Sequence, residues 1–331
     1  MDALTLTLWI VLPLAQSTSP SPGANVRQPH QQDPQQQATQ TEDVNGALQL
    51  QVMLDRAGFS PGAIDGRMGA NTKKALDLFH QSGNEETSAV EPTTTYQITG
   101  DDAAGPFIER LPDDMMESAN LPALGYTSVI EELAERFHTT PAFLKQLNPG
   151  ATFAVDQEIE VPNVQPMILP APAAPVPTTP VGTAGSAKAQ FASRADVTVT
   201  VAKNTSALTV TDASGRVLLY APVTTGSVHD PLPLGEWKVT GIQFNPKFHY
   251  NPDLFWDADP AHTQATVQSG PNNPVGVVWI DLSKAHYGLH GTPEPSTIGR
   301  TQSHGCVRLT NWDALKLASL VKPGTRVLFT E

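Results

Sequence analysis

The chain has 331 residues, 30 of them proline, a formal net charge of −13 and a single cysteine. This length suffices for two or three compact units. The acidic balance argues against a nucleic acid as partner, because phosphate contacts need lysine and arginine. One cysteine excludes a disulfide within the chain, so packed cores must hold the fold.

The N-terminus begins with a short apolar run, Leu4–Ala15, followed by a polar tract. The run has the length of the hydrophobic part of a signal peptide and is short for a bilayer crossing. We therefore expect residues 1–15 to be a signal or anchor segment, and the protein to be exported to the periplasm or cell envelope. Asp2 replaces the usual basic lead, so cleavage of the segment stays open. Residues 16–43, rich in Gln, Pro and Ser, are expected to form a disordered tether.

Residues 44–83 are expected to form a small all-α unit. Apolar side chains recur at helical spacing around Val52 and again around Phe79, on either side of a glycine-rich turn. Asn71 or Thr72 is expected to cap the second helix. A unit this short is suited to docking rather than to catalysis.

These residues resemble a peptidoglycan-binding domain of the first type, which implies that the unit binds the cell wall. The alternative is a plain helical bundle whose glycines only make turns. The matching positions are Leu48-Gln49, Leu54, Gly58-Phe59, Pro61-Gly62, Ile64-Asp65-Gly66, Gly69, Thr72, Ala75 and Phe79.

The middle of the chain is acidic, with 15 acidic and three basic residues between Glu85 and Glu160. Within it, residues 95–164 end in a predicted helix, turn, helix and strand, with Thr140 as a helix cap. Tyr96–Ile98 is a candidate first strand, although the segment that follows it is long. This region is similar to the second half of a LysM glycan-binding module, which implies either glycan binding or a remnant that only packs. The matching positions are Leu147-Asn148-Pro149 and Ile159-Glu160-Val161-Pro162.

Residues 165–190 form a Pro/Ala-rich linker, which is expected to be extended and semi-stiff. We therefore expect the docking half and the C-terminal half to be mechanically separate.

Residues 196–330 consist of short segments of alternating apolar residues separated by turn residues. This pattern predicts a mostly β fold, a sandwich or a barrel, and we take the β-sandwich as the expected form. A hairpin is expected at Ala213-Ser214-Gly215. One C-terminal helix is expected, because Thr310 and Asp313 have capping-box spacing. The expected fold class is thus multidomain, a small all-α module followed by a mostly β domain.

Cys306 is the candidate nucleophile of the C-terminal domain. Gly305 before it has no side chain, so a substrate carbonyl could approach backbone N–H groups there. A thiol needs a base to become strongly nucleophilic at neutral pH, and His290 and His304 are both close in sequence. Arg308 shares the strand face of Cys306 and could keep the thiol's surroundings positive or bind a carboxylate.

Two other interpretations of Cys306 are weaker. One cysteine and two histidines lack a fourth ligand and a familiar zinc spacing, so no metal is expected, and no cofactor is predicted. A buried structural cysteine is also possible in principle. However, a Ser-His-Gly-Cys run with a second histidine and an arginine nearby is a poor way to fill an apolar core.

The segment from Thr198 to Thr330 resembles the L,D-transpeptidase catalytic domain of the YkuD type. The resemblance implies that Cys306 is the nucleophile, His290 its base, and the Gly291 carbonyl the group that orients the imidazole. It further implies a substrate pocket and oxyanion site shaped by Tyr287, Thr292, Ser303, His304, Gly305 and Arg308. The matching positions are Thr225-Gly226, Pro233-Leu234-Gly235-Glu236-Trp237, Gly270-Pro271-Asn272-Asn273-Pro274-Val275-Gly276, Tyr287-Gly288-Leu289-His290-Gly291-Thr292, Ile298-Gly299 and Ser303-His304-Gly305-Cys306-Val307-Arg308-Leu309.

The choice of His290 over His304 also has a reason in the residues. In a regular strand His304 would share the face of Cys306, but Gly305 between them indicates a turn or bulge. His290 ends a separate predicted strand that can pair beside the strand of Cys306 and present its ring across the ladder.

The resemblance implies acyl transfer between peptidoglycan stem peptides. Cys306 would attack the diaminopimelate carbonyl of a tetrapeptide stem, expel D-alanine, and pass the thioester to an amine of a second stem or of a lipoprotein. Water as acceptor would make the enzyme an L,D-carboxypeptidase. Acylation by carbapenems is implied as well. The alternative from another class is a structural protein that binds peptidoglycan and uses the β domain only as a scaffold.

Overall fold

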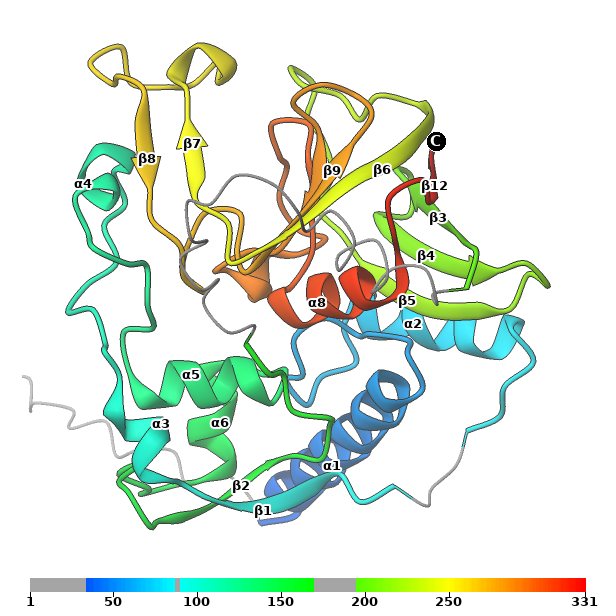
Figure 1. The fold of residues 1–331 in the computed structure, drawn as a ribbon. Coiled ribbons are helices and arrows are strands. Elements are labelled where there is room, and N and C mark those ends of the chain that lie inside the picture. The colour runs from blue at the N-terminus through cyan, green and yellow to red at the C-terminus, as the bar shows by residue number, and fades with distance from the viewer. Residues whose placement is uncertain (1–33, 87–89, 170–194) are drawn as a thin grey trace, which may run out of the picture. The chain divides into compact units, whose positions relative to one another are not determined.

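The computed structural model describes residues 34–86, 90–169 and 195–331 (Figure 1). The chain divides into two compact units, Met1–Thr39 and Gln40–Glu331. Apart from the start of the first helix, the described residues belong to the second unit. The predicted signal or anchor segment and most of the predicted linker lie outside the described residues. None of the helices in the described ranges combines the length and the hydrophobicity needed to cross a membrane.

Two helices, α1 (Pro34–Arg56) and α2 (Ala70–Gln81), form the first part of the described chain. The start of α1 lies within the range where a tether is predicted; glutamine and alanine, which are common there, are good helix formers. The predicted cap of α2 is wrong. The helix begins after Gly69, whose backbone is extended, and no side chain caps it.

The turn between α1 and α2 is held by a buried side chain, Gln51. Its amide oxygen accepts hydrogen bonds from the backbone N–H groups of Asp65 (3.2 Å) and Gly66 (2.9 Å). Its amide nitrogen donates to the Thr72 hydroxyl at 3.1 Å. Thr72, predicted as a possible cap, therefore ties α2 to α1 instead.

The middle region has the order strand, helices, strand. Its outer strands pair antiparallel, with Thr93 opposite Pro162 and Gln97 opposite Glu158. The first strand thus begins three residues before the predicted Tyr96, and two extra short helices account for the long segment after it. Thr140 caps its helix as predicted, by accepting from the Phe143 N–H. The elements are β1 (Thr93–Gln97), α3 (Gly100–Ala104), α4 (Met115–Ala119), α5 (Val129–Arg136), α6 (Pro141–Leu147) and β2 (Glu158–Pro162).

The C-terminal half is mostly β. An eight-stranded sheet has the order β11-β10-β9-β6-β12-β3-β4-β5, and β7 and β8 form a separate hairpin-like pair. Its elements are β3 (Val197–Ala202), β4 (Ala207–Asp212), β5 (Val217–Pro222), β6 (Gly235–Phe244), β7 (Phe248–Tyr250), η1 (Pro252–Leu254), β8 (Ala265–Val267), β9 (Val278–Leu282), β10 (Gly288–His290), η2 (Pro295–Thr297), β11 (Val307–Arg308), α8 (Asn311–Leu320) and β12 (Arg326–Thr330).

This sheet corrects the expected β-sandwich. Thr224, just beyond the edge strand β5, pairs with Arg308 of the opposite edge strand β11 through two backbone hydrogen bonds of 3.0 and 2.9 Å. One curled sheet therefore meets itself, where two facing sheets were expected. Alternating apolar residues could not distinguish these forms, because both bury one face of every strand.

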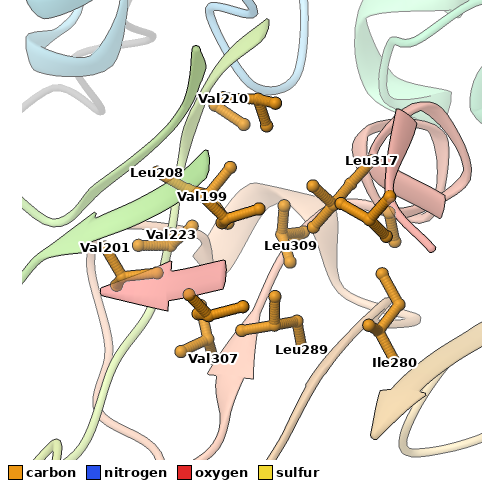
Figure 2. Close-up of a cluster of buried hydrophobic side chains, with 14 of the residues drawn as sticks. Val199, Val201, Leu208, Val210, Val223, Ile280, Leu289, Val307, Leu309 and Leu317 are labelled. Atoms are coloured by element: carbon orange, nitrogen blue, oxygen red, sulfur yellow. The ribbon is translucent and has the colours of Figure 1, made fainter. Parts of the chain in front are cut away.

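The core of this half lies between the curled sheet and α8 (Figure 2). Along β3, Val199 and Val201 are fully buried and the alternate residues Thr198 and Thr200 are not, as the alternation predicts. Leu289 and Val307 come from the neighbouring strands β10 and β11, and Leu317 comes from α8. Burial of each such side chain contributes about 1.5–3 kcal/mol. The helix begins at the predicted cap, Thr310, which accepts from the Asp313 N–H.

The expectation that the two halves are mechanically separate is wrong. The Ser60 N–H donates to the Tyr220 carbonyl at 2.9 Å, and the Tyr220 N–H donates to the Gly58 carbonyl at 2.8 Å. The composition of the linker gave no indication of this, since it says nothing about the surfaces that the linker joins. One buried cluster contains residues of both halves, namely Met53, Leu54, Phe59, Ala75, Phe79, Ala207 and Tyr220.

Buried polar groups also connect the halves. The carboxylate of Asp313 on α8 accepts from the hydroxyls of Ser60 (2.8 Å) and Thr310 (2.7 Å). The ring of His138 stacks on Trp312, with centroids 5.1 Å apart and planes 7° apart. Nδ1 of His138 lies 2.9 Å from the Asp55 carboxylate. Burial raises the pKa of Asp313 to about 7, against the opposing effect of its hydrogen bonds.

We predict that Asp313→Asn makes the protein more stable than the wild type above pH 7. The unfolded carboxyl loses its proton near pH 4, whereas the folded one keeps it up to about pH 7. The unfolded state thus binds fewer protons in this window, and wild-type stability falls as the pH rises through it. The asparagine side chain does not titrate and can still accept from Ser60.

The measurement is urea unfolding at intervals from about pH 4 to about pH 8, with the exposed Asp101→Asn as control. The free-energy difference between variant and wild type should move in the variant's favour by on the order of 2–4 kcal/mol. A difference that does not change with pH would show that Asp313 has the same pKa in the folded and unfolded states, contrary to the prediction.

Candidate active site

The candidate site lies on three neighbouring strands, β9, β10 and β11. In the register of this ladder, His290 stands opposite Trp279 on one side and opposite Arg308 on the other. Directly opposed residues point to the same face of a sheet, so these three side chains form a row. The predicted pairing of the His290 strand beside the strand that follows Cys306 is confirmed.

Cys306 immediately precedes β11 and lies two residues before Arg308, whose charge acts on its thiol. Its thiol is partly exposed and lies 3.7 Å from the His286 carbonyl oxygen, which the S–H group can face as a weak donor. Burial raises the pKa of this thiol, against the opposing effects of a Gly288 backbone hydrogen bond and the Arg308 charge. The thiol is therefore protonated at neutral pH and needs a base.

The tautomer of His290 is fixed by a hydrogen bond. Its Nδ1 lies 2.7 Å from the Gly291 carbonyl oxygen, which can only accept, so Nδ1 carries the proton. Nε2 is left with its lone pair. Burial first, and the charge of Arg308 second, lower the pKa of His290 to about 3, so the imidazole is neutral at working pH.

A tryptophan that sequence reasoning missed fixes the ring of His290. The Trp279 indole stacks on the imidazole with centroids 5.4 Å apart and planes 20° apart. The indole also covers Gly288, where an added Cβ would lie 2.5 Å from a Trp279 ring carbon. Alternation along the predicted strand could have placed Trp279 on one face, but nothing local indicated that His290 would be its partner.

Gly305 occupies a conformation that favours glycine, with φ of +102°. A Cβ there would lie 2.8 Å from the Tyr287 ring. Tyr287, predicted to bind substrate, therefore lies against the backbone just before the thiol. Burial raises the pKa of its hydroxyl.

The other two residues predicted to bind substrate are buried and engaged with the backbone. The Ser303 hydroxyl donates to the Cys306 carbonyl at 2.6 Å and so closes the turn before β11. The Thr292 hydroxyl accepts from the Glu294 N–H at 3.3 Å. In these positions both side chains shape the loops around the site.

His304 is tied to a different part of the domain. Its Nε2 lies 2.7 Å from the carboxylate of Asp257, which belongs to the connection between β7 and β8. Phe255 of the same connection packs edge-on against the ring, with centroids 4.9 Å apart. The ring of His304 therefore attaches this connection to the segment that carries Cys306.

Asn311 is a second residue that sequence reasoning missed. It is fully buried at the start of α8, and its side-chain oxygen accepts from the Val277 N–H at 3.1 Å. In the sequence, only its place directly after the predicted helix cap Thr310 could have marked it. No group of three or more potential metal ligands lies close together in the ranges that the structure describes.

Comparison with known proteins identifies the class of this fold and site. Residues 196–328 match the YkuD family, the L,D-transpeptidase catalytic domain. YkuD of Bacillus licheniformis is 31% identical over 205 residues, which are 61% of this chain and 93% of the relative. YkuD of Bacillus subtilis is 34% identical over 114 residues, 34% of this chain and 54% of the relative. The chain belongs to the YkuD family of L,D-transpeptidases.

Solved structures are more distant. An L,D-transpeptidase from Mycobacterium smegmatis is 20% identical, with a TM-score of 0.34 over 41% of this chain and 59% of that one. L,D-transpeptidase 3 from Mycobacterium tuberculosis, solved with a faropenem-derived adduct, is 18% identical, with a TM-score of 0.34 over 41% and 60% of the two chains.

We predict that His290 stays neutral from about pH 8 down to about pH 5, since burial and Arg308 disfavour its charged form. Nitrogen NMR of the ring should show one tautomer, with the proton on Nδ1, throughout this range. The denatured protein is the control, and there the same residue should titrate near pH 6.5. A transition near that pH in the folded protein would contradict the assignment.

Proposed function

We propose that this protein is an exported cell-wall enzyme that transfers acyl groups through a thioester on Cys306. The observation that carries the proposal is the contact between His290 Nδ1 and the Gly291 carbonyl, which leaves the lone pair on Nε2 as the base. This ring stands opposite Arg308, whose charge acts on the Cys306 thiol. A scaffold protein would need neither this base nor the thiol beside it. Membership of the L,D-transpeptidase family supports the same conclusion.

The reaction begins when Nε2 of His290 takes the thiol proton as Sγ attacks the diaminopimelate carbonyl of a tetrapeptide stem. The C–S bond forms, and the carbonyl oxygen becomes an oxyanion beside the backbone at Gly305. The bond to D-alanine then breaks, and the proton on His290 passes to the leaving amine. A thioester remains on Cys306.

In the second half, an amine of another stem attacks the thioester while His290 accepts its proton, and the thiol is released. The product is a crosslink between the third residues of two stems. A lipoprotein amine would attach that protein to the wall, and water would release a tripeptide stem. Arg308 supports each route, because its guanidinium fork can bind a stem carboxylate beside the thiol.

The N-terminal half is proposed to bind the wall itself. Residues 44–83 have the pattern of a peptidoglycan-binding unit. Residues 95–164 contain the two helices α5 and α6 followed by the strand β2, as expected of the second half of a LysM-like unit, with the short helices α3 and α4 inserted after β1. Since both pack in the same compact unit as the catalytic domain, bound glycan would lie at a fixed distance from Cys306.

We predict that Cys306→Ala abolishes turnover and leaves the fold intact, because the partly exposed thiol contributes bond-making rather than core packing. Cys306→Ser should be almost as inactive, since a hydroxyl is a weak nucleophile without a stronger base. The measurement is mass spectrometry of products from a disaccharide-tetrapeptide, with loss of alanine and a dimer as the wild-type result. Wild-type crosslinking by the alanine variant would sink the nucleophile assignment.

We predict that His290→Ala slows acylation by a carbapenem about 10²- to 10⁴-fold, the usual contribution of a general base. His304→Ala should cost clearly less, because that ring holds the β7–β8 connection through Asp257. Intact-protein mass, followed over time in each variant, measures the rates. A slow His304 variant beside a His290 variant of near-normal rate would reverse the two roles.

A further inference from the structure

We propose that Glu135, in the N-terminal half, is a positioning residue for His290 and acts through Asn311. The inference rests on the proposed function, because it concerns the base of that reaction. It assigns part of the active site to the half of the chain that sequence reasoning regarded as a docking module.

The first link is between Glu135 and Asn311. Glu135 lies on α5 and is buried, and one carboxylate oxygen accepts from the Tyr126 hydroxyl at 2.7 Å. The other oxygen accepts from Nδ2 of Asn311 at 2.8 Å. Burial raises the pKa of Glu135 to about 7, so the fold keeps a carboxyl here that costs free energy. An apolar residue of similar volume would avoid that cost.

The second link is the orientation of the Asn311 amide. Its nitrogen donates to Glu135 and, at 3.2 Å, to the Pro271 carbonyl. Its oxygen accepts from the Val277 N–H at 3.1 Å. An ionised carboxylate can only accept, so Glu135 favours the same orientation of the amide as the Pro271 carbonyl and the Val277 N–H. An amide turned by 180° would place its NH2 group against the Val277 N–H.

The third link joins Asn311 to the carbonyl that orients His290. An added Cβ on Gly291 would lie 2.0 Å from the Asn311 side-chain oxygen, so the amide packs directly on the Gly291 backbone. The Gly291 N–H donates to the Val278 carbonyl at 3.2 Å, and its own carbonyl accepts from His290 Nδ1 at 2.7 Å. A displaced Asn311 would therefore move the group that fixes the tautomer and the angle of the imidazole.

A purely structural role for Glu135, as one of several contacts between the halves, makes a different prediction. Ser60 and Asp313 form another buried contact between the halves, and the hydrogen bonds of the Asn311 side chain go to other partners. Ser60→Ala is therefore the matched control for interface stability. If Glu135 only joins the halves, its loss and the loss of the Ser60 hydroxyl should affect the active site alike.

The test uses the full chain and the double variant Tyr126→Phe, Glu135→Leu. This variant removes the carboxylate and its hydroxyl partner together, and the Asn311 amide nitrogen keeps its hydrogen bond to the Pro271 carbonyl, so the fold should persist. Glu135→Gln is the rescue variant, because its amide oxygen can accept from Asn311 while its nitrogen donates to the Tyr126 hydroxyl. Thermal unfolding confirms that each protein is folded.

Two readouts are made with each variant. The first is the acylation rate at saturating imipenem, which we expect to fall about 10- to 100-fold in the double variant, the scale of a misplaced catalytic group. It should recover in Glu135→Gln and stay at the wild-type value in Ser60→Ala. The second is the NMR signal of the His290 Nδ1 proton, which should shift or broaden only in the double variant.

Wild-type acylation and an unchanged Nδ1 proton in the double variant would overturn the inference. So would an equal loss in Ser60→Ala, or a Glu135→Gln variant as slow as the double variant. Should the wild-type protein itself resist acylation, the proposed function fails. The Nδ1 signal would still decide whether Glu135 positions His290.

Discussion

Two backbone hydrogen bonds between Thr224 and Arg308 hold the catalytic half in its shape. They join the two edges of an eight-stranded sheet, and they do so on β11, a strand of only two residues. A strand so short has little ladder of its own. The direction of β11 is fixed by its pairing with Thr224 on one side and with β10 on the other. On the β10 side, the Leu309 N–H donates to the His290 carbonyl at 2.8 Å. Cys306 stands directly before this strand, so the closure of the sheet determines where the thiol points relative to His290.

The polar chemistry of the site follows from its burial. An exposed histidine would be partly charged near neutral pH, but His290 is packed under Trp279 and beside Arg308, and both its surroundings and that charge favour the neutral ring. A neutral ring whose Nδ1 is bound to a carbonyl can act only through Nε2. In the proposed reaction, the Gly291 carbonyl takes the place that an acidic side chain has in a catalytic triad. The backbone supplies this carbonyl, and the residues packed on that backbone determine the position of the carbonyl oxygen.

Local sequence patterns predicted the structural features that depend on residues close together in the chain. The alternation of β3, the caps at Thr140 and Thr310, and the pairing of the His290 strand beside β11 all agree with the structure. Contacts between distant residues carry no local pattern. Ser60 meets Asp313 and Glu135 meets Asn311 across more than half of the chain, which is why the two halves were expected to be independent. The β-sandwich was expected for the same reason. Strand alternation does not indicate that Thr224 pairs with Arg308 and so joins the two edges of one sheet. The roles of the individual site residues stay predictions.

The central claim, a thioester on Cys306, is tested most directly by trapping it. The protein is mixed briefly with a disaccharide-tetrapeptide, quenched in acid and cleaved, and its peptides are mapped by mass spectrometry. We expect an added disaccharide-tripeptide acyl group on the peptide that contains Cys306, and one free D-alanine for each adduct. An adduct on another residue, or D-alanine released equally well by Cys306→Ala, would contradict it.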